Sequence, residues 1–454
     1  MKLLYLLFAL DLLNLAVFLP VFNPFSRSLG GTPFTIGLIN SCSALVSLLW
    51  NPIVGSLSDQ VGRKSILIKC LTASSIGSIV LAFSSSLTMV FIGKMIGALG
   101  SPVGILLRST VADIYKTAEE KKAFFNKCAP IMSVAFLVGS LSSGFLSEAK
   151  GGFSMAFLLM ASIMGLGAVI ANSTISNDLK LKEQQKEKVS FVSKATKELK
   201  SAVVNIRTIS WPHYKDLFLI KGFYDFTLAN QNLASDSKQT KDKSKPKLSL
   251  IQKGIGELKK AAQDIKSISK PHYRRLFTIK ACYDFATAII LANLGLIMVN
   301  EFNITGRYMG YVFLMTSVIS IIANIVNLRA HSILKRIALS RMLFIGGSIL
   351  TISYIGLGVS ISSKTSFLTF MCLMCFANAF MDTTLAEMAT SEAKEEERGK
   401  VISACENMVQ LAQIIVPVLS GSVAEIIEQR FIVLSATVPM VTLMVVANSK
   451  VKTN

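Results

Sequence analysis

The sequence is poor in charged residues and in histidine. Only 16% of the 454 residues are Asp, Glu, Lys or Arg, whereas 52% are hydrophobic, and there are three histidines. His213, His272 and His331 all fall in polar loops outside the apolar stretches, so we expect no histidine proton relay. The sequence also lacks a glycine-rich nucleotide-binding loop, a metal-binding cluster and a hydrolytic triad. We therefore predict that the protein is not an enzyme and that it uses no cofactor and no metal.

Cysteine is present but follows no recognisable pattern. The seven cysteines lie mostly inside apolar stretches, and Cys372 and Cys375 share one hydrophobic run. Small, soft side chains in such a run pack against their neighbours more often than they form a redox pair. We predict packing roles for them, with no disulfide framework and no zinc site.

Long apolar stretches dominate what is present. The mean hydropathy is +0.54, and we count twelve stretches of about 20 apolar residues, the length that a helix needs to cross a bilayer. The first stretch, residues 3–22, contains Asp11 and lacks a small-residue cleavage site, so we interpret it as a spanning helix and not as a signal peptide. The predicted fold class is all-α, a polytopic membrane protein with twelve transmembrane helices.

The formal net charge of +20 is unevenly placed along the chain. Lysine and arginine gather in alternate loops, at residues 63–69, 116–122, 175–275, 335–341, 394–400 and 450–452. Cytoplasmic loops of membrane proteins carry such an excess. We therefore predict a multi-pass protein of the plasma membrane or an endomembrane, with both termini cytoplasmic, the lipid bilayer as partner and no nucleic-acid partner.

A short polar stretch, residues 55–65, joins the second and third apolar segments. Its length predicts a tight turn, in which Gly62 supplies a conformation that a side chain would hinder and Gly55 allows close helix approach. Asp59, Arg63 and Lys64 add charges of both signs. We interpret this stretch as a conformational latch.

The pattern of this turn, G-x-L-x-D-x-x-G-R-K, resembles the signature loop of the major facilitator superfamily of secondary carriers. The pattern L-D-x-x-N-x-x-x-x-x-P in residues 10–20 resembles the first helix of the tetracycline-resistance-like drug:proton antiporters. A thinner resemblance extends to the animal orphan group of major facilitator superfamily domain-containing protein 9. It is carried by Leu10-Asp11, Thr32-Pro33, residues 108–113 and Asp382. The resemblance implies two pseudo-symmetric six-helix bundles, with a substrate site near mid-membrane lined by helices one, four, seven and ten.

One departure from the antiporter pattern concerns the fifth segment. Ser140 and Ser143 stand where the antiporter signature has a proline and a glycine, which leaves the direction of transport open.

Two repeats organise the chain. A half-repeat relates the fourth loop and fifth segment to the tenth loop and eleventh segment, and a local repeat duplicates residues 182–230 at residues 241–289. We predict an N-terminal bundle over residues 1–174, a basic cytoplasmic linker over residues 175–275 and a C-terminal bundle over residues 276–454. The extra copy is either a duplicated coding unit or a genuine insert, and the linker either lies on the anionic inner leaflet or is solvated.

Three carboxylates lie within apolar segments that the resemblance places around the cavity. Asp11, with Asn14 beside it, lies in the first segment, Asp284 in the seventh and Asp382 in the tenth. An ionised carboxylate inside a membrane is costly unless it faces a cavity or a partner. These four residues are our candidates for substrate or proton binding, with Asp11 the leading one. The alternatives are hydrogen bonds to neighbouring helices for Asp11 and an ion pair with Lys280 for Asp284.

The latch hypothesis assigns partners to the charges of the turn. Arg63 is predicted to pair with Asp113, at the cytoplasmic end of the fourth segment, and Asp59 to cap the eleventh helix, so that the outward-facing state is held. Gly55, Gly62 and Lys64 complete the predicted latch. Arg108 either takes part in transport or extends to the membrane interface.

These observations predict a proton-coupled secondary transporter, monomeric, that moves a small organic solute by alternating access. Negative groups in the cavity would favour cationic solutes. The alternative hypothesis is a facilitator-fold membrane receptor or scaffold that no longer transports and acts through its central loop.

Overall fold

The structure is a computed structural model that describes residues 2–115, 118–149, 151–174, 271–304, 306–334, 339–392 and 398–448. Within these ranges the chain forms helices joined by short turns, without a β-strand. The predicted basic linker and the first copy of the local repeat lie outside the described residues, apart from the start of α12.

The first half contains α1 (Lys2–Ser28), α2 (Pro33–Val61), α3 (Arg63–Ala82), α4 (Leu87–Leu99), α5 (Val103–Ile114), α6 (Ala118–Glu148) and α7 (Phe153–Thr174). The second half contains α12 (Pro271–Asn300), α13 (Gly306–Leu334), α14 (Leu339–Val359), α15 (Lys364–Glu392), α16 (Arg398–Ala424), α17 (Gln429–Ser435) and α18 (Thr437–Asn448), with a 3-10 turn at Ser360–Ser362. Ten stretches of the described chain are long and apolar enough to cross a membrane, and Met408–Ala424 is a shorter apolar helix.

Two predicted segments are each built from two helices. The fourth segment is α4 followed by α5, and it is interrupted at residues 100–102, because Pro102 has no backbone N–H to continue the helix. Ser101 in this interruption donates a hydrogen bond to Asn51 of α2 (3.3 Å). The twelfth segment is α17 followed by α18, with Pro439 in the first turn of α18.

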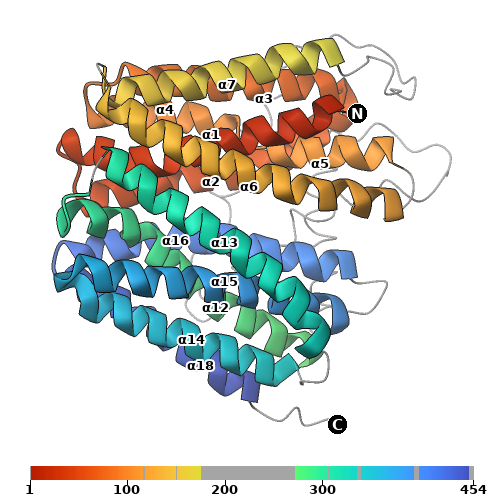
Figure 1. Cartoon of the computed structure of the whole chain (residues 1–454). Coiled ribbons are helices and arrows are strands. Elements are labelled where there is room, and N and C mark those ends of the chain that lie inside the picture. Colours follow the sequence, from red (N-terminus) through yellow and green to blue (C-terminus); the bar gives the residue numbers. More distant parts are fainter. Residues whose placement is uncertain are drawn as a thin grey trace, which may run out of the picture.

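The two halves form separate bundles of helices (Figure 1), and each encloses its own hydrophobic core. The core of the first half collects buried side chains between Leu4 and Ala171, joined from the other half by Leu296. The core of the second half collects buried side chains between Tyr273 and Ala447. Burial of apolar side chains therefore stabilises each half separately.

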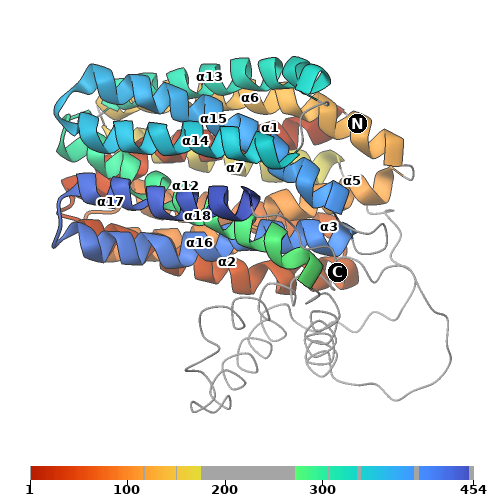
Figure 2. The same cartoon turned by 90° about the horizontal axis from the view of Figure 1, so that it is seen from below.

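The helices run between two ends of the bundle. We call the end at which α1 begins and α18 finishes the terminal end, and the other the opposite end. Both views place the start of α1 and the finish of α18 at the same end of the bundle (Figures 1 and 2). Helix α13 lies against α6 at the opposite end and diverges from it toward the terminal end (Figure 1).

Close contacts between the halves lie at the opposite end. A Cβ placed on Gly144 of α6 would be 2.9 Å from the Cα of Gly310 in α13, so the two backbones touch. One turn further along α6, Glu148 Oε2 forms an ion pair with Arg307 Nε (3.1 Å), and Glu148 Oε1 accepts a hydrogen bond from the Arg307 backbone N–H (2.8 Å).

The pair α2 and α16 repeats this arrangement. A Cβ on Gly37 would lie 2.1 Å from the carbonyl oxygen of Pro417, and one on Gly421 would lie 2.6 Å from that of Pro33. Only glycine allows backbones to approach so closely. The two halves are thus closed against each other at the opposite end.

Candidate functional site

Asp11 and Asn14 lie on α1, and Asp11 faces the interrupted fourth segment. Asp11 is half-buried, and its Oδ2 lies 3.5 Å from the point that a Cβ on Gly104 would occupy, at the start of α5. Arg108, one turn further along α5, attracts the carboxylate electrostatically. The Oδ1 atom of Asn14 is buried and has no hydrogen-bond partner among the residues described. Asp11 therefore lies beside two sources of positive potential, the start of α5 and Arg108.

Asp284 occupies the corresponding first helix of the second half, α12. Its carboxylate is buried, and Oδ1 accepts a hydrogen bond from Lys280 Nζ, one turn earlier, at 2.5 Å. The predicted pairing of Lys280 with Asp284 is present in the structure. The second oxygen, Oδ2, is buried without a hydrogen-bond partner in the described part of the chain. The ion pair thus leaves half of this carboxylate unsatisfied.

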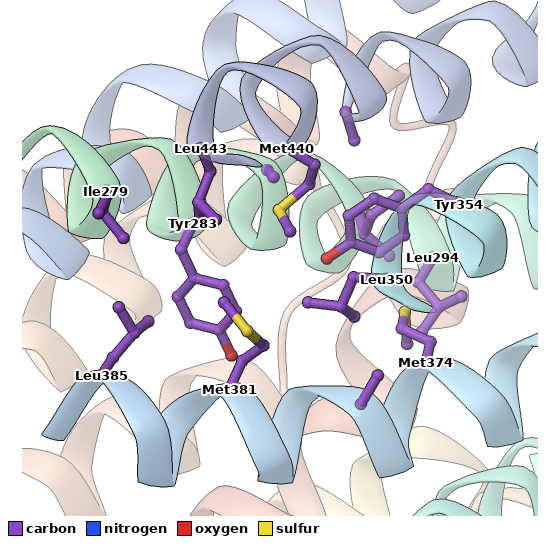
Figure 3. Close-up of a cluster of buried hydrophobic side chains, with 14 of the residues drawn as sticks. Ile279, Tyr283, Leu294, Leu350, Tyr354, Met374, Met381, Leu385, Met440 and Leu443 are labelled. Carbon is purple, nitrogen blue, oxygen red and sulfur yellow. The ribbon is translucent and has the colours of Figure 1, made fainter. Parts of the chain in front are cut away.

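Asp382 is held from across the helix interface by a tyrosine. The Tyr283 hydroxyl, on α12, donates a hydrogen bond to Asp382 Oδ1 on α15 (2.8 Å) and lies 3.3 Å from Asn378 Oδ1. Figure 3 shows the Tyr283 ring reaching from α12 toward α15, packed beside Met381. Lys280 also attracts Asp382 electrostatically. Asp284 and Asp382 consequently share one lysine and one neighbouring tyrosine.

The carboxylates of the two halves lie at matching depths. Asn23 of α1 and Gly295 of α12 meet at the opposite end, where a Cβ on Gly295 would clash with the Asn23 side chain. Asp11 precedes Asn23 by twelve residues and Asp284 precedes Gly295 by eleven, which places both about 17 Å of helix rise from this contact. The charged groups therefore form one level, toward the terminal end from the closed contacts.

The predicted latch pair is also present. Arg63 Nε donates to Asp113 Oδ2, and Arg63 Nη1 donates to Ser58 Oγ (3.2 Å). Arg63 begins α3 and Asp113 lies in the last turn of α5, so each charge lies at the helix end whose dipole disfavours it. Pairing offsets both costs. The pair joins two helices of the same half.

The turn conformation expected of Gly62 is present, whereas the close helix approach expected at Gly55 is not. The turn is a single residue, because α2 continues to Val61 and α3 begins at Arg63; Gly62 joins them with φ +102°, a conformation that favours glycine. A Cβ on Gly55 would meet nothing within 4 Å, so the close approach expected there is absent in this structure. Lys64 is half-buried in the first turn of α3. The side chain of Asp59 lies outside the described part.

Sequence reasoning missed Lys94, the only lysine of α4. Its Nζ lies 3.7 Å from the centroid of the Phe18 ring and 4.8 Å from that of Phe22, both on α1. A cation inside an apolar segment is a functional signal in a membrane protein, and it was available because Lys94 interrupts an otherwise apolar run. Tyr283 was visible only as a member of the local repeat, since its contact with Asp382 depends on packing between helices.

The arrangement provides carboxylates that can bind protons or cations, with basic and hydroxyl groups beside them. No group of three His, Cys, Asp or Glu side chains in the described ranges is arranged to hold a metal ion.

Comparisons with known proteins agree with this architecture. Residues 4–231 and 276–450 match the family model of the Major Facilitator Superfamily. The tetracycline resistance protein, class H, of Pasteurella multocida is 28% identical over 112 residues, which is 25% of this chain and 28% of that protein. Multidrug resistance protein 1 of Bacillus subtilis is 26% identical over 223 residues, 48% of this chain and 52% of that protein. The chain thus matches about a quarter to a half of these relatives' lengths.

The fold itself is matched over nearly the whole chain. The human organic anion transporter MFSD10 (TETRAN) superposes with a TM-score of 0.59 at 16% identity, covering 98% of both chains. The family match over both halves, with the membrane-length helices and their closed opposite end, leads to one conclusion: this chain belongs to the Major Facilitator Superfamily.

Proposed function

We propose that the protein is a proton-coupled secondary transporter that moves a small organic solute by alternating access. The observation that carries the proposal is the level of carboxylates formed by Asp11, Asp284 and Asp382, which lies toward the terminal end from the contacts that join the halves. The resemblance to a tetracycline resistance protein and to an organic anion transporter supports a small organic solute.

The terminal end is the cytoplasmic one in this proposal, because α3, α12 and α16 begin there with basic residues, among them Arg63, Arg274 and Arg398. The contacts at Gly144, Gly310 and the Glu148 to Arg307 ion pair then seal the outer side. In this proposal the structure represents an inward-facing state. In the outward-facing state these contacts separate and the terminal ends of the two halves meet, with Asp59 capping the eleventh helix and the Arg63 to Asp113 pair fixing the turn that carries Asp59.

In this proposal, proton binding to the carboxylates is coupled to the change between the inward-facing and outward-facing states. Ionised Asp11 is attracted by Arg108 across the interface of α1 and α5, and this attraction opposes a shift of one helix against the other. Protonation removes the negative charge, so the attraction is lost and the charge no longer has to pass through a closed intermediate. Protonation of Asp382 would act in the same way. The hydrogen bond from Tyr283 would lose its charged acceptor and become weaker.

The test is proton movement in proteoliposomes that contain the purified full chain and a pH-sensitive dye in the lumen. A panel of organic anions, cations and neutral metabolites is added, and wild type is compared with Asp11→Asn. The control is Glu301→Gln, which makes the same carboxyl-to-amide change on an exposed residue at the opposite end. A compound that changes the lumenal pH with wild type and Glu301→Gln, but not with Asp11→Asn, supports the proposal. An equal pH change with all three proteins refutes the role of Asp11.

A further inference from the structure

Lys94 is a cation inside the membrane-spanning part of the first half. It lies seven residues into α4, about 10 Å of helix rise from the opposite end. Its ammonium group rests on two aromatic rings of α1 that stack on each other, Phe18 and Phe22, with centroids 4.8 Å apart. Such a pair of ring faces attracts a cation, but it accepts no charge-assisted hydrogen bond of the strength that a carboxylate accepts.

The carboxylates of the site have other partners. Asp11 lies seven residues before Phe18 on α1, about 10 Å away along the helix, and is attracted by Arg108. Asp284 is paired with Lys280, and Asp382 with the Tyr283 hydroxyl. No ion pair or hydrogen bond of Lys94 to a carboxylate is found in the described residues. Lys94 is thus a positive charge whose counter-charge is missing from that part of the chain.

Lys94 lies close to the contacts that close the opposite end. Lys94 itself is only half-buried. It lies just inside the closed contact between Asn23 and Gly295, because its partner Phe22 immediately precedes Asn23. On α12, Leu291 lies one turn from Gly295 toward the terminal end and is 60% exposed, so the close contact that Gly295 makes with Asn23 does not extend to Leu291. Lys94 therefore lies next to the contacts that close the opposite end, on the side toward the terminal end.

We propose that Lys94 is the recognition group for a negatively charged group of the transported solute, so that the solute class is an organic anion. This inference rests on the proposed transport function and names its substrate class. The ammonium group offers three donors, and it donates no hydrogen bond to an acceptor among the described residues, so these donors remain for an anionic oxygen. The stacked rings provide an apolar surface for the organic part of the same solute. This proposal replaces the earlier expectation, which was based on the carboxylates alone, that the solute is a cation.

The experiment compares two dyes that share a xanthene core and differ in charge, 6-carboxyfluorescein and rhodamine 123. Binding to the detergent-purified full chain is measured by fluorescence anisotropy, and uptake into proteoliposomes by mass spectrometry. The variants are Lys94→Gln, which removes the charge, and Lys94→Arg, which keeps it. The matched control is Lys364→Gln, because Lys364 also lies over an aromatic ring (Tyr308, 5.4 Å) but is exposed at the opposite end.

Wild type and Lys364→Gln are expected to bind the anionic dye equally. Lys94→Arg should retain most of this binding, and Lys94→Gln should weaken it about tenfold or more, the scale of one charge-assisted hydrogen bond. Thermal unfolding and gel filtration of each variant show whether it is folded. If Lys94→Gln does not fold, Lys94→Arg carries the test, since a purely structural lysine tolerates this change with no selective effect on either dye.

Two results would overturn the proposal. One is wild-type protein that does not bind the anionic dye, or prefers the cationic one. The other is equal affinity for the anion in wild type and Lys94→Gln. Either result leaves the transport function standing if the cationic dye is taken up. Conversely, anion binding that depends on Lys94 without any uptake supports this inference and contradicts the transport function.

Discussion

Replacing Gly144 or Gly310 with alanine should push the two halves apart at the opposite end. In either case the new Cβ would lie 2.9 Å from the Cα atom of the other glycine, whereas carbon atoms in contact are about 3.5–4.0 Å apart. The helices must therefore separate by roughly 0.6–1.1 Å at this point. The Cα atom that the new Cβ meets belongs to the backbone, and the position of the Cβ is fixed by its own backbone, so no side-chain rotation relieves the clash.

The size of the expected shift between the two states can be estimated from the free-energy cost of overpacking an interface. Inserting a methyl group into a tightly packed interface costs about 1–3 kcal/mol, and each 1.4 kcal/mol is about a tenfold change in an equilibrium constant. The state closed at the opposite end should lose about 5- to 150-fold in population relative to the state open there. The neighbouring ion pair of Glu148 with Arg307 is expected to weaken as well, because the same helices carry it.

Hydrogen exchange followed by mass spectrometry measures this shift on the full chain. Peptides covering residues 140–148 and 306–312 should exchange faster in Gly144→Ala, and peptides covering residues 58–66 should exchange more slowly. The matched control is Gly97→Ala, a glycine inside α4 whose added Cβ meets nothing within 4 Å. The reasoning is refuted if both ends exchange as in wild type, or if Gly97→Ala produces the same pattern.

Three further predictions concern the ion pairs and the tyrosine. Arg63→Glu and Asp113→Arg should each reduce transport, and the double reversal should recover part of it in a proteoliposome assay, because the charges are exchanged and not lost; no recovery would contradict the pairing. Tyr283→Phe should lower kcat/KM about tenfold or more while the thermal midpoint stays near that of wild type, since only the hydroxyl that donates to a charged acceptor is removed. Lys280→Met should lower the thermal midpoint, and adding Asp284→Leu should restore it, because the single change leaves a buried charge unpaired; equal midpoints for the single and double variants would contradict this.

Much of the fold could be predicted because it depends on local properties. Hydropathy located the spanning stretches. The contact of Lys280 with Asp284 followed from their spacing of one helical turn. The pairing of Arg63 with Asp113 followed from their placement at the same face of the membrane. A tight turn with a special conformation at Gly62 was predicted, but the polar stretch around it was not expected to be almost entirely helical: α2 runs to Val61, and its residues Leu57 and Ser58 are buried.

The rest depends on how helices pack. The hydrogen bond from Tyr283 to Asp382 joins residues on different helices, and no spacing in the sequence brings them together. The interruption after α4 had a local signal in Gly100 and Pro102, yet hydropathy alone treats the whole stretch as one segment. Lys94 was also visible in the sequence. Its role could not be inferred there, because it depends on the contact of Lys94 with two rings of α1 and on the lack of an ion pair between Lys94 and a described carboxylate.

The most direct test of proton-coupled transport is uphill accumulation driven by an imposed pH gradient. Proteoliposomes containing the full chain are given a compound that triggers a pH change, and its lumenal concentration is followed with and without a protonophore. Wild type is predicted to accumulate the compound above its external concentration only while the gradient lasts, and Asp11→Asn should at most equilibrate it. Equilibration without accumulation by wild type, unaffected by the gradient, would contradict the account and identify a facilitated uniporter.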